Sequence, residues 1–281
     1  MVNYSAAFKL PFTSLNRSAA LFFIAAVASL ANVSYSITSE MLKNDAGRYS
    51  GQAIWLNLSA GLISFGIGLF FSVVLSGYSI RIAANAMRGK NEMPPFDNVP
   101  SLIGAGFKYM AALIAYTLPL LLIITLMALS AVAKPAVLLL SALVIFAAFL
   151  WLFFICYCGP MLLAHFAREN RFAAFFELGK ILKYSFTPAY FIPWLAAFGY
   201  SIGIGIPYII IVILISFLSM ISPLAMLLLV PFGALFTLIL TPTVASLYGQ
   251  AYREVIGGKA IATAAAPVRV KPKAAKGKSK K

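Results

Sequence analysis

Charge is scarce in this 281-residue chain: charged residues make up 10% of it, whereas an average soluble domain carries about 25%. Apolar residues make up 62%. So few charged side chains cannot cover the surface of a water-soluble domain of this length. The composition therefore excludes an ordinary soluble domain and predicts a protein whose surface lies largely in lipid.

Residues that carry chemistry are scarce as well. The chain has one histidine, His165, and seven carboxylates, all outside the long apolar runs. Its two cysteines, Cys156 and Cys158, stand inside such a run, which is typical of packing residues rather than of a disulfide framework or a metal site. The sequence contains no paired acids, no nucleophile with a base and no glycine-rich nucleotide loop. We therefore expect no enzyme activity and no catalytic, cofactor-binding or metal-binding residues.

Six apolar runs without a charged residue lie at about 18–37, 53–80, 109–133, 136–164, 189–218 and 222–250. A helix of about 20 apolar residues crosses the ~30 Å hydrocarbon core of a bilayer. Ser219, Ser222 and Pro223 separate the last two runs, since proline interrupts helical hydrogen bonds. Lys134 and Pro135 separate the third run from the fourth. The pattern predicts an all-α integral membrane protein with six transmembrane helices arranged as three helical hairpins.

Lysine and arginine gather on alternate connections between these runs. One side would hold eleven of them: Lys9, Arg17, Arg81, Arg88, Lys90, Lys108, Arg168, Arg171, Lys180, Lys183 and Arg253. The other side would hold three: Lys43, Arg48 and Lys134. Because positive residues in short loops favour the cytoplasm, both termini are predicted to be cytoplasmic. The chain then divides into a cytoplasmic interfacial segment at 1–17, a six-helix transmembrane domain at 18–255 and a disordered basic cytoplasmic tail at 256–281.

The tail contains many lysines and no acidic residue. Its candidate contacts with anionic lipid are Lys271, Lys273, Lys276, Lys278, Lys280 and Lys281. Each cation held near an anionic surface gains roughly 1 kcal/mol, although such a tail can also serve only as a topology anchor. A basic tail without aromatic residues does not indicate specific nucleic-acid recognition. The expected partners are membrane lipids, with anionic headgroups at the cytoplasmic face, and the sequence leaves open a protein partner or a homo-oligomer.

Residues 171–186 predict an amphipathic helix. Its apolar residues recur at spacings of three and four: Phe172, Phe175, Phe176, Leu182 and Phe186. Glu177, Lys180 and Tyr184 share the opposite side. Such a helix either lies in the headgroup plane or packs on the helix bundle. In the fifth run, Gly199 and Gly203 have the spacing of a close contact between two helices.

The absence of ionisable residues from the apolar runs restricts the range of possible functions. Proton- and ion-coupled transporters usually keep such residues within the membrane. The favoured hypothesis is a non-catalytic membrane protein that organises the membrane or contacts lipid or partner proteins. The alternative is a permease or channel for a neutral or amphipathic small solute, with a cavity lined by Asn57, Thr237 or Thr241. Helices broken by proline would mark its site, and the last two runs contain Pro193, Pro207, Pro231 and Pro242.

Several short motifs, spread over residues from about 60 to 255, carry a resemblance to a known family. The residues are Gly77, Tyr78, Arg81, Asn85, Gly89, Pro94, Phe96, Asp97, Tyr116, Pro119, Phe175, Gly179, Gly249, Gln250, Tyr252 and Arg253. In this pattern the chain resembles the membrane family known as domain of unknown function 4013. The resemblance implies a prokaryotic cytoplasmic (inner) membrane protein with six spans, and it implies no activity. Phe96 stands where the family more often has tryptophan.

One contact within this motif can be predicted from the charges. Asp97 shares a loop with the end of the second run, which carries Arg81, and Arg253 emerges on the same side of the membrane. We expect the Asp97 carboxylate to lie within reach of Arg81 or Arg253 and to hold the loop against the bundle.

Overall fold

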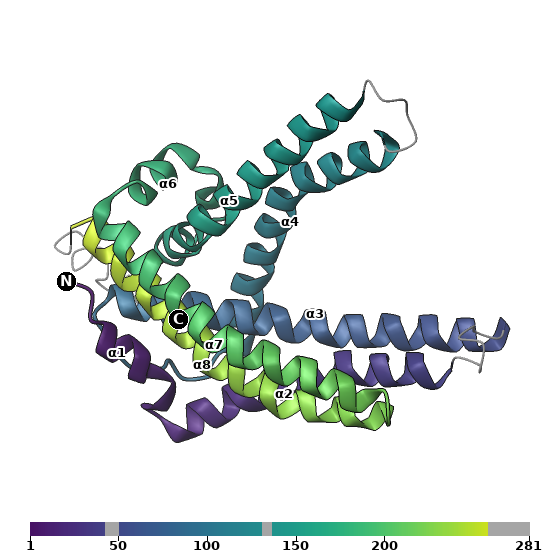
Figure 1. Ribbon diagram of the computed structural model, residues 1–281. Helices are drawn as coiled ribbons and strands as arrows, with labels where there is room; N and C mark the ends of the chain where they lie inside the picture. Colours follow the sequence, from purple (N-terminus) through teal and green to yellow (C-terminus); the bar gives the residue numbers. More distant parts are fainter. Residues whose placement is uncertain (43–50, 131–136, 258–281) are drawn as a thin grey trace, which may run out of the picture.

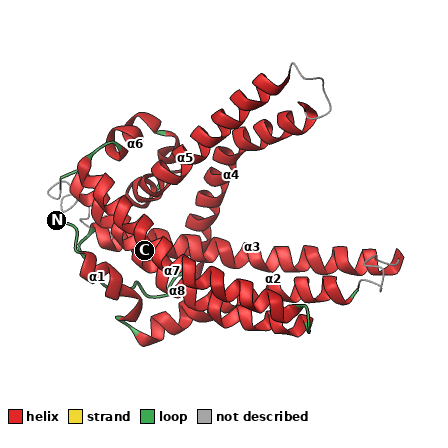
Figure 2. Cartoon of the chain, in the orientation of Figure 1, coloured by secondary structure: helices red, strands yellow, loops and turns green. Residues whose placement is uncertain are grey.

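The computed structural model describes residues 1–42, 51–130 and 137–257, and within these it consists of helices joined by loops, with no strand (Figures 1 and 2). The elements are α1 (Tyr4–Lys9), η1 (Leu10–Phe12), α2 (Leu15–Met41), α3 (Gly51–Met87), α4 (Val99–Ser130), α5 (Val137–Glu169), η2 (Phe172–Phe176), α6 (Leu178–Ser185), α7 (Pro188–Ser219), η3 (Pro223–Leu228) and α8 (Leu229–Val255). Lys43, Arg48, Lys134 and the tail lysines lie outside the described residues.

Within the described residues, six helices are long and apolar enough to cross a membrane, which confirms the predicted all-α class and the number of spans. They are Leu15–Met41, Ala53–Met87, Val99–Leu122, Ile145–Glu169, Pro188–Ser219 and Pro223–Val255. The third spanning helix begins at Val99, well before the charge-free run. Its first turns therefore include Lys108, which precedes the apolar part of the helix. The division between the last two spans is confirmed, since α7 ends at Ser219 and η3 begins at Pro223.

Four of the long helices, α2, α3, α7 and α8, pack side by side, while α4 and α5 diverge from them as a separate arm (Figure 1). The arm joins the bundle where α4 crosses α3 and where α5 contacts α8. α4 bends partway along its length, and Pro119 inside it supplies the cause, since proline removes a helical hydrogen bond. Pro193, Pro207 and Pro242 lie inside α7 and α8 without ending either helix.

The outward faces of the helices are apolar. Phe65 on α3, Phe149 on α5 and Phe217 on α7 are each more than 60% exposed, with many leucines and isoleucines around them. An exposed apolar surface of this extent is stable only when another apolar medium covers it. The protein is therefore a multi-pass membrane protein whose long helices present these side chains to lipid.

The buried core, in contrast, lies toward one end of the molecule. Its largest fully buried side chains include Tyr78, Tyr190, Tyr252, Phe166 and Phe175. Contacts described below bring residues 1–12, 88–98, 168–187 and 246–257 together at this end, which we call the loop end.

Three glycines allow the backbones of neighbouring helices to touch. A Cβ added at Gly77 would overlap the Leu102 carbonyl of α4, and one added at Gly106 would overlap the Val73 carbonyl of α3. A Cβ added at Gly249 would overlap the Ala83 carbonyl oxygen, so α8 also approaches α3 closely. The expected contact at Gly199 and Gly203 is wrong within the chain, since a Cβ at either would have no described neighbour within 4 Å.

We predict that Gly77→Ala destabilises the crossing of α3 and α4. The added methyl group would meet backbone atoms, which cannot rotate away, and overpacking of this kind costs about 1–3 kcal/mol. Thermal unfolding in detergent, followed by circular dichroism, should show a clearly lower midpoint. Gly104→Ala on α4 is the control, because nothing described lies within 4 Å of its Cβ position. An unchanged midpoint for Gly77→Ala would contradict the close crossing.

Candidate functional site

The end of α3 is closed by a glycine in a left-handed conformation. Gly89 has φ +75°, and its N–H donates to the Ala86 carbonyl at 3.0 Å. The Lys90 N–H donates to the Asn85 carbonyl, also at 3.0 Å. These two bonds form a Schellman motif, which satisfies the last carbonyls of a helix and requires a residue that tolerates positive φ. The motif explains why glycine stands at position 89. It directs the following chain back across the loop end as the loop of residues 88–98, which we call the returning loop.

The returning loop is held by two side chains of α3. The Tyr78 hydroxyl donates to the Pro94 carbonyl at 2.8 Å, and its ring stacks on Phe96 at 3.9 Å. Arg81 Nη1 donates to the carbonyls of Pro95 and Asp97 and lies 2.5 Å from Asp97 Oδ1. The predicted contact between Asp97 and Arg81 is confirmed. Because one guanidinium binds three acceptors on the loop, it fixes the loop backbone as well as the carboxylate.

The N-terminal segment is attached to the same loop and to α8. Arg17 on α2 donates to the Met93 carbonyl, and the Met93 side chain is fully buried. The Asn3 N–H donates to Gln250 Oε1 on α8 at 2.6 Å, and Gln250 Nε2 donates to Ser246 at 3.2 Å. Segments at the two ends and the middle of the chain therefore meet at the loop end.

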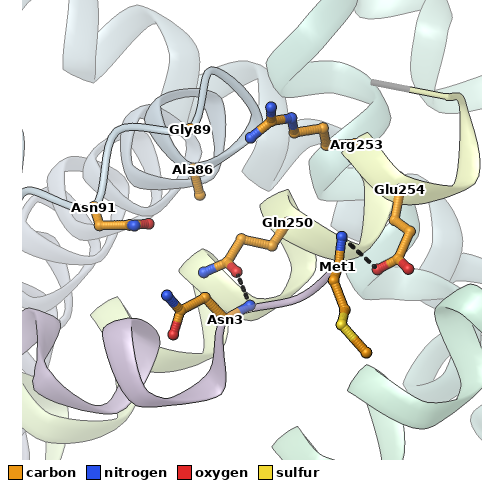
Figure 3. A pocket seen from close by; sticks show the side chains of 8 residues that line it. All are labelled: Met1, Asn3, Ala86, Gly89, Asn91, Gln250, Arg253 and Glu254. Atoms are coloured by element: carbon orange, nitrogen blue, oxygen red, sulfur yellow. Dashed lines mark hydrogen bonds and ion pairs between the residues drawn. The ribbon is translucent and has the colours of Figure 1, made fainter. Parts of the chain in front are cut away.

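Where these segments meet, they enclose a polar pocket of about 360 Å³ (Figure 3). It is lined by Met1, Asn3, Ala86, Gly89, Asn91, Gln250, Arg253 and Glu254. This volume falls within the range of roughly 300–1,000 Å³ that small-molecule sites occupy. The pocket brings together Gly89, Gln250 and Arg253, three of the predicted motif residues that are far apart in the sequence.

Arg253 supplies the cationic side chain of the pocket. Its guanidinium lies over Gly89, so that a Cβ there would stand 2.8 Å from Nη1. It makes no hydrogen bond or ion pair with the residues that the structure describes. Glu254 lies on another side of the pocket, where its Oε2 is 3.9 Å from the Met1 nitrogen. The pocket thus offers unpaired guanidinium donors and a loosely paired carboxylate.

An apolar groove adjoins this pocket. Its volume is about 350 Å³, and it shares Met1 and Glu254 with the polar pocket. The rest of its lining comes from α1 with the residues before it and from the first turns of α7: Val2, Tyr4, Pro188, Ala189, Ile192 and Pro193. A polar pocket that continues into an apolar groove has the shape and polarity of a site for an amphipathic molecule.

A buried network that the sequence analysis missed lies beside this site. His165 is 2% exposed; its Nδ1 lies 2.7 Å from the Tyr252 hydroxyl and its Nε2 3.0 Å from Glu177 Oε2. Glu177 also pairs with Arg171 and Lys180, both at 2.8 Å. A proton on Nε2 would face the carboxylate and leave Nδ1 to accept a hydrogen bond from the Tyr252 hydroxyl. The network ties α5, α6 and α8 together, and a single histidine in the sequence carried no signal of it.

Glu177 also changes the predicted amphipathic segment. Residues 171–186 do not form one helix; η2 and α6 are separated at Glu177, whose backbone leaves the helical region at ψ 56°. The break turns this carboxylate inward to His165. Phe172, Phe176 and Phe186 are 42–71% exposed, whereas Ile181 and Ser185 are buried. The segment packs on the bundle through Ala174, Phe175, Ile181 and Ser185 and presents its other phenylalanines outward.

The remaining motif residues have separate roles. The Tyr116 hydroxyl on α4 donates to the Phe175 carbonyl, and Phe175 stacks on Phe166 at 4.3 Å. Pro119 lies in α4 and Gly179 in α6, where nothing described lies within 4 Å of its Cβ position. Nothing in the structure explains glycine at 179. The predicted motif residues therefore divide between the helix crossings, the returning loop, the pocket and the anchor of η2.

Comparison with known proteins gives one result. Residues 60–215, which are more than half of the chain, match the model of a family described as protein of unknown function (DUF4013). The match covers most of α3 through most of α7, so Gln250 and Arg253 lie outside it. No curated protein and no solved structure gives a significant match to the chain.

We predict a pH effect from Glu177. Lys180 and His165 lower its pKa to about 2, from a usual value of about 4.3. Because the folded-state pKa is lowered, the stabilisation is present above pH ~4.3 and is lost as the pH falls toward 2. The thermal midpoint of the wild type should fall between pH 6 and pH 2.5, and that of Glu177→Gln should start lower and fall less. Parallel pH profiles for the two proteins would contradict the assignment.

Proposed function

We propose, since the chain belongs to the DUF4013 family, that this multi-pass protein is a non-catalytic lipid-binding protein of the prokaryotic cytoplasmic membrane. In this proposal the loop end and both terminal segments face the cytoplasm. The pocket beside Arg253 holds the phosphate of a phospholipid headgroup, and the adjoining apolar groove takes the upper part of an acyl chain. The protein acts by holding lipid at this position and so organises the membrane around it.

The observation that carries the proposal is the unpaired guanidinium of Arg253. An arginine without a described partner, in a pocket lined also by Asn91 and Gln250, offers planar donors suited to two phosphate oxygens. The adjoining groove begins at the first turns of α7, which is a membrane-spanning helix. A headgroup in the pocket would therefore have its chain directed toward the bilayer.

The charge on the predicted cytoplasmic side of the molecule supports the same proposal. The eleven cations that the sequence analysis assigned to this side stand against five acids there, Glu92, Asp97, Glu169, Glu177 and Glu254. An excess of cations attracts anionic lipid and favours the cytoplasmic side. The outward phenylalanines Phe172, Phe176 and Phe186 suit the boundary between headgroups and acyl chains.

We predict that Arg253→Gln lowers the amount of phospholipid that stays bound during purification. The substitution removes the charge-assisted donors, and retention measured by native mass spectrometry should fall at least about tenfold, as expected for a bond to a charged group worth roughly 1.5–3 kcal/mol. Arg88→Gln is the matched control, because it removes an exposed cation from the same end that does not line the pocket. Equal losses in the two variants would reduce the effect to general charge and contradict a headgroup site.

A second pair of variants separates the position of Arg253 from its charge. Gly89 and Gly257 both have positive φ, at 75° and 73°, so alanine strains the backbone at either. Only at Gly89 would the new Cβ displace Arg253. Gly89→Ala should therefore lower lipid retention, while Gly257→Ala should leave it unchanged.

A second candidate function, passage of a neutral solute, is favoured by a cleft within the membrane. The cleft has a volume of about 290 Å³ and lies among α3, α4, α5, α7 and α8. Its polar lining consists of hydroxyl groups, from Ser79, Tyr109, Ser201, Thr241 and Tyr248. Thr241 was expected at such a cavity; Asn57 and Thr237 do not line it, and the Thr237 hydroxyl donates to the Gly233 carbonyl.

If the cleft conducts a small polyol, Thr241→Val should slow glycerol entry into proteoliposomes, because it removes a hydroxyl from the lining without changing its volume. Stopped-flow light scattering measures the rate. Thr125→Val on α4 is the control, since that hydroxyl donates to its own helix at the Leu121 carbonyl. If proteoliposomes with the wild-type protein took up glycerol no faster than protein-free liposomes, passage of glycerol through the cleft would be excluded.

A further inference from the structure

The two charged residues of the pocket, although adjacent in the sequence, lie on different sides of it. Successive residues of a helix project about 100° apart, and Figure 3 shows Arg253 directed toward Gly89 while Glu254 is directed toward Met1. No ion pair joins Arg253 to Glu254 within the described residues. The pocket therefore presents a guanidinium and a carboxylate to the same enclosed volume.

The surfaces between these charges are polar and uncharged. Asn3, Asn91 and Gln250 complete the polar lining, and the Gln250 carbonyl is already bound to the Asn3 N–H. A ligand with only negative charge would meet the Glu254 carboxylate and be repelled by it. A ligand with both charges, a phosphate and a cation joined by a short link, would be matched on both sides.

The kind of cation follows from the geometry of Glu254. Its side chain is 38% exposed, and its Oε2 lies 3.9 Å from the Met1 N-terminal ammonium, within reach of a weak ion pair but too far for a hydrogen bond. The carboxylate therefore retains its acceptor capacity. A primary ammonium has three N–H donors for such a carboxylate, whereas a quaternary ammonium has none.

The adjoining groove indicates that the ligand carries an acyl chain. Glu254 forms a wall of both cavities, so a molecule whose ammonium contacts Glu254 lies at the boundary between them. Beyond Glu254 the lining is apolar, from Pro188, Ala189, Ile192 and Pro193 on α7. The ligand is thus a lipid rather than a free phosphoamine.

We infer that the pocket selects an aminophospholipid, with the headgroup phosphate on Arg253 and the primary ammonium on Glu254. This inference rests on the proposed function and adds the headgroup class to it. Selection of one headgroup class distinguishes the pocket from the rest of the loop end, where the excess of cations attracts anionic lipid of any kind.

The test is competition among headgroups in nanodiscs that contain equal amounts of phosphatidylethanolamine, phosphatidylcholine and phosphatidylglycerol. The full-length protein is released from the nanodiscs, and the lipids that remain bound are counted by native mass spectrometry. The wild type should retain phosphatidylethanolamine over phosphatidylcholine by up to about fivefold, the upper range for a partly exposed ion pair. Loading at 1 M salt, where the Debye length is about 3 Å, removes the nonspecific attraction of phosphatidylglycerol.

Glu254→Gln should abolish the preference for phosphatidylethanolamine over phosphatidylcholine, because it removes the carboxylate that binds the primary ammonium. Glu92→Gln is the matched control, because Glu92 is exposed in the 88–98 loop and does not line the pocket. It should keep the preference, and comparable thermal midpoints will show that both variants fold.

The outcomes separate this inference from the proposed function. If Arg253→Gln lowers retention but Glu254→Gln leaves the preference unchanged, a headgroup site exists and the aminophospholipid assignment is wrong. If neither substitution changes retention or preference, the proposed function fails as well. Dominant retention of phosphatidylglycerol at 1 M salt would also overturn the assignment.

Discussion

The loop end depends on the contact that Arg81 makes with the returning loop. One guanidinium binds the carbonyls of Pro95 and Asp97 together with the Asp97 carboxylate. Asp97 is 70% exposed, so the ion pair by itself contributes little. Its importance is geometric: with Tyr78 bound to Pro94, it directs the loop so that Arg17 reaches the Met93 carbonyl and Asn91 lines the pocket.

Close helix packing makes this arrangement possible. Gly77 lies one residue before Tyr78 and lets α4 contact the backbone of α3, while Gly249 lies one residue before Gln250 and does the same for α8. In lipid the hydrophobic effect does not drive helices together, so backbone contact at small residues supplies van der Waals attraction instead. The residues that position the helices are thus immediate neighbours of those that form the loop contacts and the pocket.

Much of the site lay within reach of sequence reasoning. The charge of the loops predicted the contact between Arg81 and Asp97, and the motif residues included Gly89, Gln250 and Arg253. Two features lay beyond it. Burial of His165 between Glu177 and Tyr252 depends on α5, α6 and α8 meeting, and Glu177 leaves the amphipathic pattern for a partner outside its own segment. The spacing of Gly199 and Gly203 satisfied the rule for close helices, yet α8 does not pack on that face of α7.

The sequence by itself determined the class of protein and the number of spans. Both follow from local properties, because each apolar run must satisfy its backbone within its own helix and span the bilayer by its own length. Tertiary structure decided which residues share a pocket. The α3–α8 crossing places Arg253 beside Gly89. It also determines that Arg253 and Glu254 line different sides of one cavity. A helix crossing is set by the packing of two surfaces distant in sequence, and no local pattern along the chain encodes it.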